Sequence, residues 1–443
     1  MNNPHLSWPG IVRLGLVQSA LGAIVVLTTS TLNRVMVVEY ALPAMLPAAL
    51  VAWHYAIQLS RPRWGYGSDM GHRRTPWIIG GMGVLCLGGV LATDATLLMA
   101  SSPVLGILLG ILAFTMIGAG VGASGTSLLA LLATRTAPQR RPAAAATTWI
   151  MMIVGIVITA AVAGSLLDPF SPQRLAFVAT GVAGVAFLVT LFAVWGVERE
   201  PERQPETQEQ KPPFAQVLRE IWAEPLSRRF TIFVFVSMLA YSAQDLILEP
   251  FAGLVFGMTP GQSTQMAGIQ HGGVLLGMIL VGAFGARLGD KKRAWMRQWT
   301  IAGCVGSALA LAALACAAMV GPAWPLRPTV FVLGFANGVF AVSAIGSMMG
   351  LAGEGRSSRE GVRMGVWGAA QAIAFACGGF AGAAGVDALR MLLPETSSAF
   401  GIVFSLEAGL FVCAAVLAAR LDLMGAAAPR VESTPSVLEG VRS

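Results

Sequence analysis

Residues 95–134 read ATLLMASSPVLGILLGILAFTMIGAGVGASGTSLLALLAT and contain no Asp, Glu, Lys or Arg. A helix needs about 20 apolar residues to cross the hydrocarbon core of a bilayer. This run holds one such span, preceded by the turn Ser101-Ser102-Pro103. Similar uncharged runs recur along the chain, and they predict a protein built from membrane-crossing helices.

The composition of the whole chain agrees with this interpretation. Of 443 residues, 12% are charged and 55% are hydrophobic, whereas about 25% are charged in a typical soluble domain. Such a sequence cannot cover a water-exposed surface, and it also excludes a disordered chain, a disulfide scaffold and a nucleic-acid binder. The net charge of +7 comes from 29 basic and 22 acidic residues, which is too small an excess for a polyanion site.

We predict an all-α polytopic membrane protein with twelve transmembrane helices. Their expected ranges are 12–36, 41–61, 75–95, 103–131, 142–166, 174–196, 230–250, 261–287, 295–319, 328–352, 361–386 and 398–420. With this count, 25 of the 29 basic residues fall on the side of the two termini, and only Arg34, Arg174, Arg327 and Arg390 fall on the other. The positive-inside rule then places both termini in the cytoplasm.

The second half of the chain repeats the first with an offset of 218 residues. Cys86 matches Cys304, Trp149 matches Trp367, and a basic turn follows both Gly71 and Gly289. Six helices repeated in parallel is the plan of the major facilitator superfamily. We therefore expect two six-helix bundles, 1–197 and 230–421, joined by a charged linker with an amphipathic helix at 198–229 and followed by a tail at 422–443.

The segment between the second and third expected helices carries a candidate motif. It contains Gly65, Asp69, Gly71, Arg73 and Arg74, and it resembles the loop motif of the major facilitator superfamily with one residue missing after the aspartate. In that superfamily the motif ties neighbouring helices together at the cytoplasmic face. The alternative is a basic loop that only sets topology.

Ionisable groups inside spans are costly, so they indicate functional sites. Two repeat-equivalent helices each carry an amide, a charge and a glutamate: Asn33, Arg34 and Glu39 in the first helix, and Gln244, Asp245 and Glu249 in the seventh. We expect these groups at the central cavity, and we hypothesise that Arg34 pairs with Asp245 to close its periplasmic side. The alternative is that all six lie at the membrane interface and are solvated.

Two histidines and one further carboxyl group are candidates for chemistry within the membrane. His54, with Gln58 one turn later, and His271 are near-equivalents in the two halves. A neutral imidazole there could ligate the magnesium of a chlorin or hydrogen-bond a neighbouring helix. Glu407 is either a proton site or a neutral packing residue. The five cysteines form no CxxC, so we expect no metal site.

The stretch from Leu27 to Gly81 carries a more specific resemblance. The segments LTTSTLNRVMVVE (27–39), LPAMLP (42–47), HYAIQ (54–58), RPRWG (61–65) and RTPWIIGG (74–81) resemble the PucC/LhaA family, a bacteriochlorophyll-delivery branch of the major facilitator superfamily in phototrophic bacteria. The similarity runs through both halves and is densest over residues 14–82.

The resemblance implies a carrier or assembly factor for light-harvesting complexes in the bacterial inner (intracytoplasmic) membrane. It implies bacteriochlorophyll as cargo and antenna polypeptides as partners, and one branch of the family is labelled a subunit of bacteriochlorophyll synthase. The chain has no P-loop and no aspartate-rich prenyltransferase cluster, so we expect neither ATP use nor catalysis. The alternatives are a proton-coupled transporter of a small amphiphile and a structural partner of photosynthetic complexes.

Overall fold

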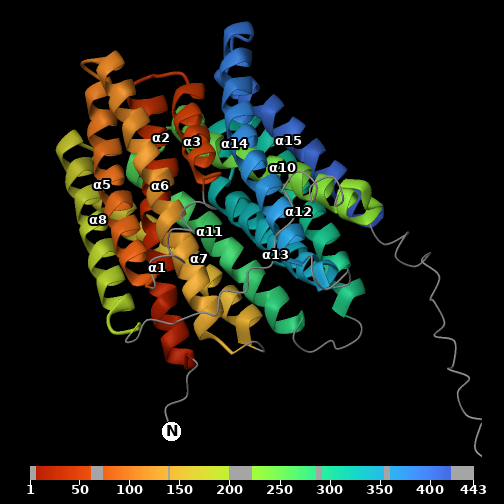
Figure 1. Ribbon diagram of the computed structural model, residues 1–443. Helices are drawn as coiled ribbons and strands as arrows, with labels where there is room; N and C mark the ends of the chain where they lie inside the picture. Colours follow the sequence, from red (N-terminus) through yellow and green to blue (C-terminus); the bar gives the residue numbers. More distant parts are fainter. Residues whose placement is uncertain are drawn as a thin grey trace, which may run out of the picture.

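The computed structural model describes residues 6–60, 73–137, 140–198, 222–285, 292–353 and 360–420. Within these ranges all regular structure is helical. Figure 1 shows the helices of the first half on the left and those of the second half on the right. Residues 199–221 of the expected linker, the tail and most of the loop motif lie outside the described residues, and the described end of the linker is already helical because α10 begins at Pro225.

Among the described residues, the first half contains six helical segments, five of which are long and apolar enough to cross a membrane. The first is continuous from Trp8 to Glu39 and consists of α1 (Trp8–Val26), η1 (Leu27–Thr31), α2 (Leu32–Arg34) and η2 (Val35–Glu39). It is followed by α3 (Met45–Gln58), α5 (Thr75–Met99), α6 (Pro103–Arg135), α7 (Arg141–Leu166) and α8 (Pro172–Val194).

The second half repeats this order. Its helices are α10 (Pro225–Phe256), α11 (Pro260–Gly285), α12 (Lys292–Val320) with a short 3-10 turn η5 (Gly321–Ala323), α13 (Leu326–Gly353), α14 (Glu360–Leu392) and α15 (Thr396–Arg420). The twelve predicted helices are thus confirmed, and eleven described segments are long and apolar enough to cross a membrane. The exception is α3, expected over 41–61, which begins only at Met45 because Pro43 and the turn at Ala41 (φ 51°) separate it from the first span.

Local sequence explains where several helices begin and end. Proline stands in the first turn of α5, α6, α7, α8 and α10, where its missing N–H has no helical partner to lose. The Ser171 hydroxyl accepts from the Arg174 amide and caps α8. Gly257 ends α10 in a left-handed conformation (φ 65°), which a side chain would strain.

The same helix pairs pack in both halves. The first span packs on α7 and α8 as α10 packs on α14 and α15, and α5 packs on α6 as α12 packs on α13. The two halves meet along α7 with α11 and α3 with α14, and Figure 1 shows α7 and α11 side by side in the middle of the bundle. The repeat predicted from the sequence is therefore a repeat of packing.

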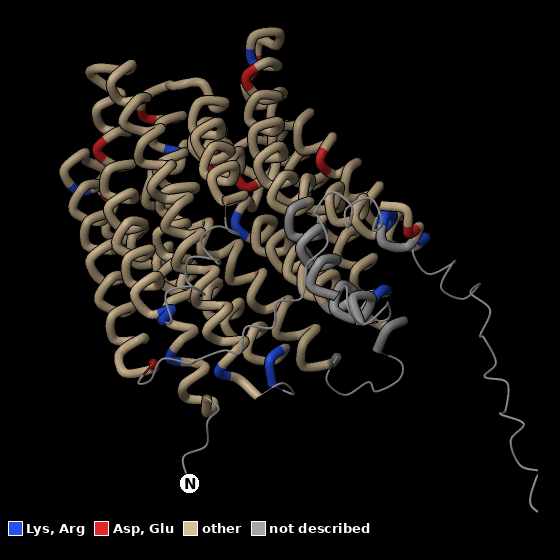
Figure 2. Tube along the Cα trace, in the orientation of Figure 1, with Lys and Arg blue, Asp and Glu red and all other residues tan. Residues whose placement is uncertain are grey.

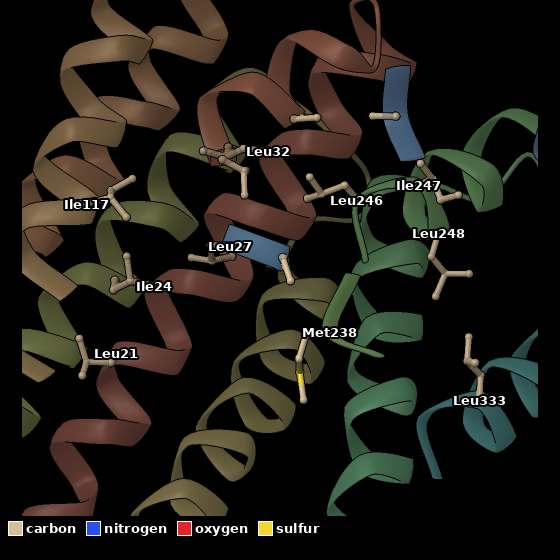
Figure 3. Close-up of a cluster of buried hydrophobic side chains, with 14 of the residues drawn as sticks. Leu21, Ile24, Leu27, Leu32, Ile117, Met238, Leu246, Ile247, Leu248 and Leu333 are labelled. Carbon is tan, nitrogen blue, oxygen red and sulfur yellow. The ribbon is translucent and has the colours of Figure 1, made fainter. Parts of the chain in front are cut away.

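Apolar side chains fill the bundle and cover its outside. Leu27 and Leu32 of the first span share a buried cluster with Met238 and Leu246 of α10 (Figure 3). Outward-facing residues such as Phe177, 75% exposed, are equally apolar, as expected for a lipid-facing surface. In Figure 2 the charged residues are few and lie mostly near helix ends.

Candidate functional site

The first span departs from regular α-helix where its polar residues lie. Its segments η1 and η2 are π-helical, with i→i+5 hydrogen bonds such as Tyr40 N–H to the Val35 carbonyl at 3.1 Å. Thr28 and Thr29 donate their hydroxyls to the carbonyls of Ile24 and Val25 at 3.0 and 2.8 Å, and such bonds compete with the backbone ladder. Each π turn accommodates an extra residue and thereby rotates the remainder of the span about its axis.

Between the two π-helical segments, Asn33 and Arg34 face the second half of the protein. Asn33 donates its amide to the Leu246 carbonyl at 2.7 Å. Arg34 is 2% exposed; it donates to the Met258 carbonyl at 2.5 Å and forms an ion pair with Glu39. The first span is thereby joined to α10 and to the turn that comes after α10.

The expected pairing of Arg34 with Asp245 is wrong for this structure. Arg34 pairs instead with Glu39. Glu39 lies five residues later, and because the intervening segment is π-helical, the two side chains lie on the same side of the span. Asp245 interacts instead with the Gln270 side chain on α11. Glu249, one turn after Asp245, accepts from Ser263 at 3.1 Å and also interacts electrostatically with Arg34.

Further contacts join the halves at one end of the bundle. We call this the distal end; there residues 40–44, 167–171, 257–259 and 393–395 connect consecutive helices. Asp387 accepts from the Met45 amide at 2.7 Å, and Asp168 accepts from the Thr259 hydroxyl at 2.9 Å. With the bond from Arg34 to Met258, these contacts hold the distal end closed.

A cavity of about 180 Å³ lies between the two halves. Its polar lining comes mainly from the second half, with Asp245 and Glu249 on α10 and Gln270 and His271 on α11. The rest of the lining is largely apolar and includes Val26, Val51, Trp149, Met152, Ile156, Met238, Leu246 and Met278. Of the described candidate site residues, only Asp245, Glu249 and His271 line this cavity.

The two histidines have different surroundings. His271 Nδ1 lies 2.9 Å from the Ala267 carbonyl oxygen; since a carbonyl only accepts, Nδ1 carries the proton, and the neutral ring keeps its lone pair on Nε2. His54 Nδ1 contacts the Val51 carbonyl in the same way, but its Nε2 lies 2.7 Å from the Gln58 amide nitrogen. His54 is buried, does not line the cavity, and has its lone pair engaged by Gln58.

Three aromatic rings at the cavity were not anticipated from the sequence. Phe375 on α14 lies 5.5 Å from Tyr55 on α3 and 5.8 Å from Tyr241 on α10, measured between ring centroids. All three line the cavity and bridge the two halves. The sequence did contain a signal for the two tyrosines. The chain has only four tyrosines, and Tyr55 and Tyr241 lie inside spans next to candidate polar residues.

The remaining buried polar candidates lie outside the cavity lining. Glu407 on α15 is 3% exposed, neither of its oxygens has a hydrogen-bond partner among the described residues, and it interacts electrostatically with Asp245. Gln244 is also fully buried, and its amide has no such partner. A carboxyl group thus lies behind the cavity wall formed by α10.

The described part of the loop motif ties helices together. Arg74 donates to the Ala130 carbonyl at 2.9 Å and to the Thr134 hydroxyl at 2.7 Å, joining α5 to α6. Glu198, after α8, accepts from the amides of Arg74 and Thr75 at 2.9 and 2.8 Å. Arg73 is exposed, and Gly65, Asp69 and Gly71 lie outside the described residues.

Known proteins resemble this chain along most of its length. A protein of Rhodobacter capsulatus named "Bacteriochlorophyll synthase 44.5 kDa chain" is 52% identical over 98% of this chain and 99% of its own length. "Protein PucC" of the same organism is 29% identical over 93% and 92%. Both similarities extend over the two six-helix halves of this chain.

Solved structures of similar fold are membrane transporters. The nucleoside transporter NupG superposes with a TM-score of 0.62 at 16% identity, covering 94% of this chain and 98% of its own. A bacterial homolog of the lysosomal transporter Spinster gives 0.66 at 14% identity, covering 96% and 98%. These likenesses show a fold of the major-facilitator type. The family described as PUCC protein matches residues 31–425, and the chain therefore belongs to the PucC family.

Proposed function

We propose that this protein is a non-enzymatic carrier that binds bacteriochlorophyll in its central cavity and delivers it during assembly of light-harvesting complexes. Membership of the PucC family, whose relatives include one named for bacteriochlorophyll synthase, supports this proposal. The observation that carries it is the His271 ring, which lines the cavity and whose Nδ1 contacts the Ala267 carbonyl, so that Nε2 is the nitrogen available to a ligand.

The cavity offers groups suited to a chlorin. An imidazole lone pair can serve as axial ligand to the central magnesium ion, by analogy with axial ligation of haem iron. The rings of Tyr55, Phe375 and Tyr241 provide flat apolar surface against which a macrocycle can stack. His54 and Gln58 bind each other, so we do not assign them a role as ligands.

The size of the cavity requires the halves to move for loading. Sites for drug-sized ligands measure about 300–1,000 Å³, whereas this cavity measures about 180 Å³. A bacteriochlorophyll therefore enters only after the halves separate at one end. We propose that Asn33 and Arg34, which join the halves near the distal end, and Glu39, which binds Arg34, form the gate that stays closed while cargo enters from the other side.

We propose antenna polypeptides as the receivers of the pigment and a bacteriochlorophyll synthase as a neighbour that supplies it. The name of the 52% identical relative supports a place beside a synthase. The PucC family membership and the transporter-like fold support a carrier over a catalyst. We place the protein in the bacterial inner membrane with both termini in the cytoplasm, as its basic residues favour.

Purification from a cell that makes bacteriochlorophyll tests the proposal. We expect a near-infrared absorption band in the purified protein, and we expect His271→Ala to lose or shift it. His54→Ala is the matched control and keeps the band, because the His54 lone pair is already occupied. Colourless protein that co-purifies with antenna subunits would instead support a structural role.

A second candidate function is proton-coupled transport of a small amphiphile. The buried Glu407, with no hydrogen-bond partner among the described residues and close to Asp245, favours it. Colourless protein that accumulates a fluorescent amphiphile in vesicles only when a pH gradient is imposed, and loses this uptake in Glu407→Gln, would support transport over pigment delivery.

A further inference from the structure

The charge of the cavity lining limits which form of a pigment it accepts. Among the described residues that line the cavity, Asp245 and Glu249 are acidic and none is Lys or Arg. Glu407 adds a third carboxyl group behind the same wall. Arg34, the cation that interacts with Glu249, lies outside the lining and already binds Glu39 and the Met258 carbonyl.

An anionic group on a ligand would be unfavourable in this cavity. A carboxylate removed from water needs a cation or several hydrogen-bond donors. His271 has its Nδ1 proton engaged by Ala267, and the other donors of the described lining, such as Tyr241 and Gln371, are neutral, so a carboxylate there would lack a counterion. An ionised Asp245 or Glu249 would repel the ligand, and a protonated one would supply no positive charge.

We propose that the cavity selects a neutral pigment, in which the carboxyl group of the macrocycle is esterified, and rejects the free acid. This inference rests on the proposed function. Ester and ketone carbonyls need only a hydrogen-bond donor, which a protonated carboxyl group or a tyrosine hydroxyl can provide. Asp245 and Glu249 thus act as specificity-determining residues.

The test compares two pigments that differ in the charge of one carboxyl group and otherwise only by a methyl group. The purified protein in detergent is titrated with the free-acid form of the bacteriochlorin and with its methyl ester, and binding is measured by absorbance and fluorescence. The methyl ester lacks the long alcohol of the natural pigment, so the comparison excludes the contribution of an apolar tail. We expect the ester to bind about tenfold more tightly or better, as expected for an anion buried without a counterion.

The variant Asp245→Asn combined with Glu249→Gln should reduce this ratio several-fold, mainly by improving binding of the free acid. Asp94→Asn, which removes one charge at an exposed position outside the lining, is the matched control and should leave the ratio unchanged. Equal or tighter binding of the free acid by the unaltered protein would overturn the selectivity while leaving the carrier function intact. Failure of both pigments to bind would overturn the carrier function itself.

Discussion

Asp168 and Asp387 make equivalent contacts on opposite halves of the protein. Asp168 lies just after α7 and accepts from the hydroxyl of Thr259, which lies immediately before α11. Asp387 lies near the end of α14 and accepts from the amide of Met45, which is the first residue of α3. The two carboxylates stand 219 residues apart, close to the offset of the sequence repeat. Each therefore reaches the beginning of a helix in the other half, where the helix dipole favours negative charge.

These two contacts should stabilise the closed distal end. In a cysteine-free background, Thr31→Cys and Thr264→Cys replace hydroxyls that lie 3.1 Å apart across the halves, so we expect the two cysteines to cross-link readily. Adding Asp168→Ala and Asp387→Ala should lower the yield, because each lost bond costs about 1 kcal/mol. Unchanged cross-linking in the double variant would contradict a role in closure.

Arg34 should contribute more to stability than Glu39. Arg34→Gln removes a buried charge and its bonds to Glu39 and Met258, and we expect about 2–3 kcal/mol lower stability. Glu39→Gln should cost less, because a glutamine side-chain oxygen can still accept from the buried Arg34 and Glu249 still interacts with the Arg34 charge. Thermal unfolding in detergent measures both, and the double variant Arg34→Gln, Glu39→Gln gives their coupling. A coupling near zero would show that the pair contributes nothing.

Gly164 should be a point at which a side chain forces the halves apart. A Cβ there would lie 2.8 Å from the Gly261 carbonyl oxygen of α11, and a Cβ at Gly261 would lie 2.5 Å from the Gly164 carbonyl oxygen. We expect Gly164→Leu to reduce the Thr31–Thr264 cross-link strongly. Gly181→Leu on α8 is the control, since nothing lies within 4 Å of that position. Equal effects of the two substitutions would show general disruption of the bundle.

Glu198 should stabilise the beginning of α5. Its carboxylate accepts from the Arg74 and Thr75 amides, which replaces the missing helical partners of that terminus. We expect Glu198→Ala to lower stability by about 1 kcal/mol, as loss of a cap does. Glu395→Ala, at an exposed position, is the comparison. If both variants unfold at the same temperature as the unaltered protein, Glu198 is not a cap.

The cavity residues show which parts of the site can be predicted from sequence patterns. Asp245, Glu249 and His271 could be selected because ionisable groups inside apolar runs are rare and costly, and the structure places all three at the cavity. Arg34 was expected at the same site but given the wrong partner. The two π-helical segments change which residues lie on the same side of the first span. Regular α-helical spacing does not predict this change.

The number of helices, the repeat and the side on which basic residues gather are determined by the sequence alone, because the bilayer imposes length, apolarity and charge asymmetry on each span separately. Which histidine keeps a free lone pair, which acid binds Arg34, and which rings meet at the cavity were decided only by the tertiary structure. These depend on contacts such as Tyr55 with Phe375 and Arg34 with Met258, between residues more than 200 positions apart. The rotation and approach of two packed halves determine such contacts, and no local pattern encodes them.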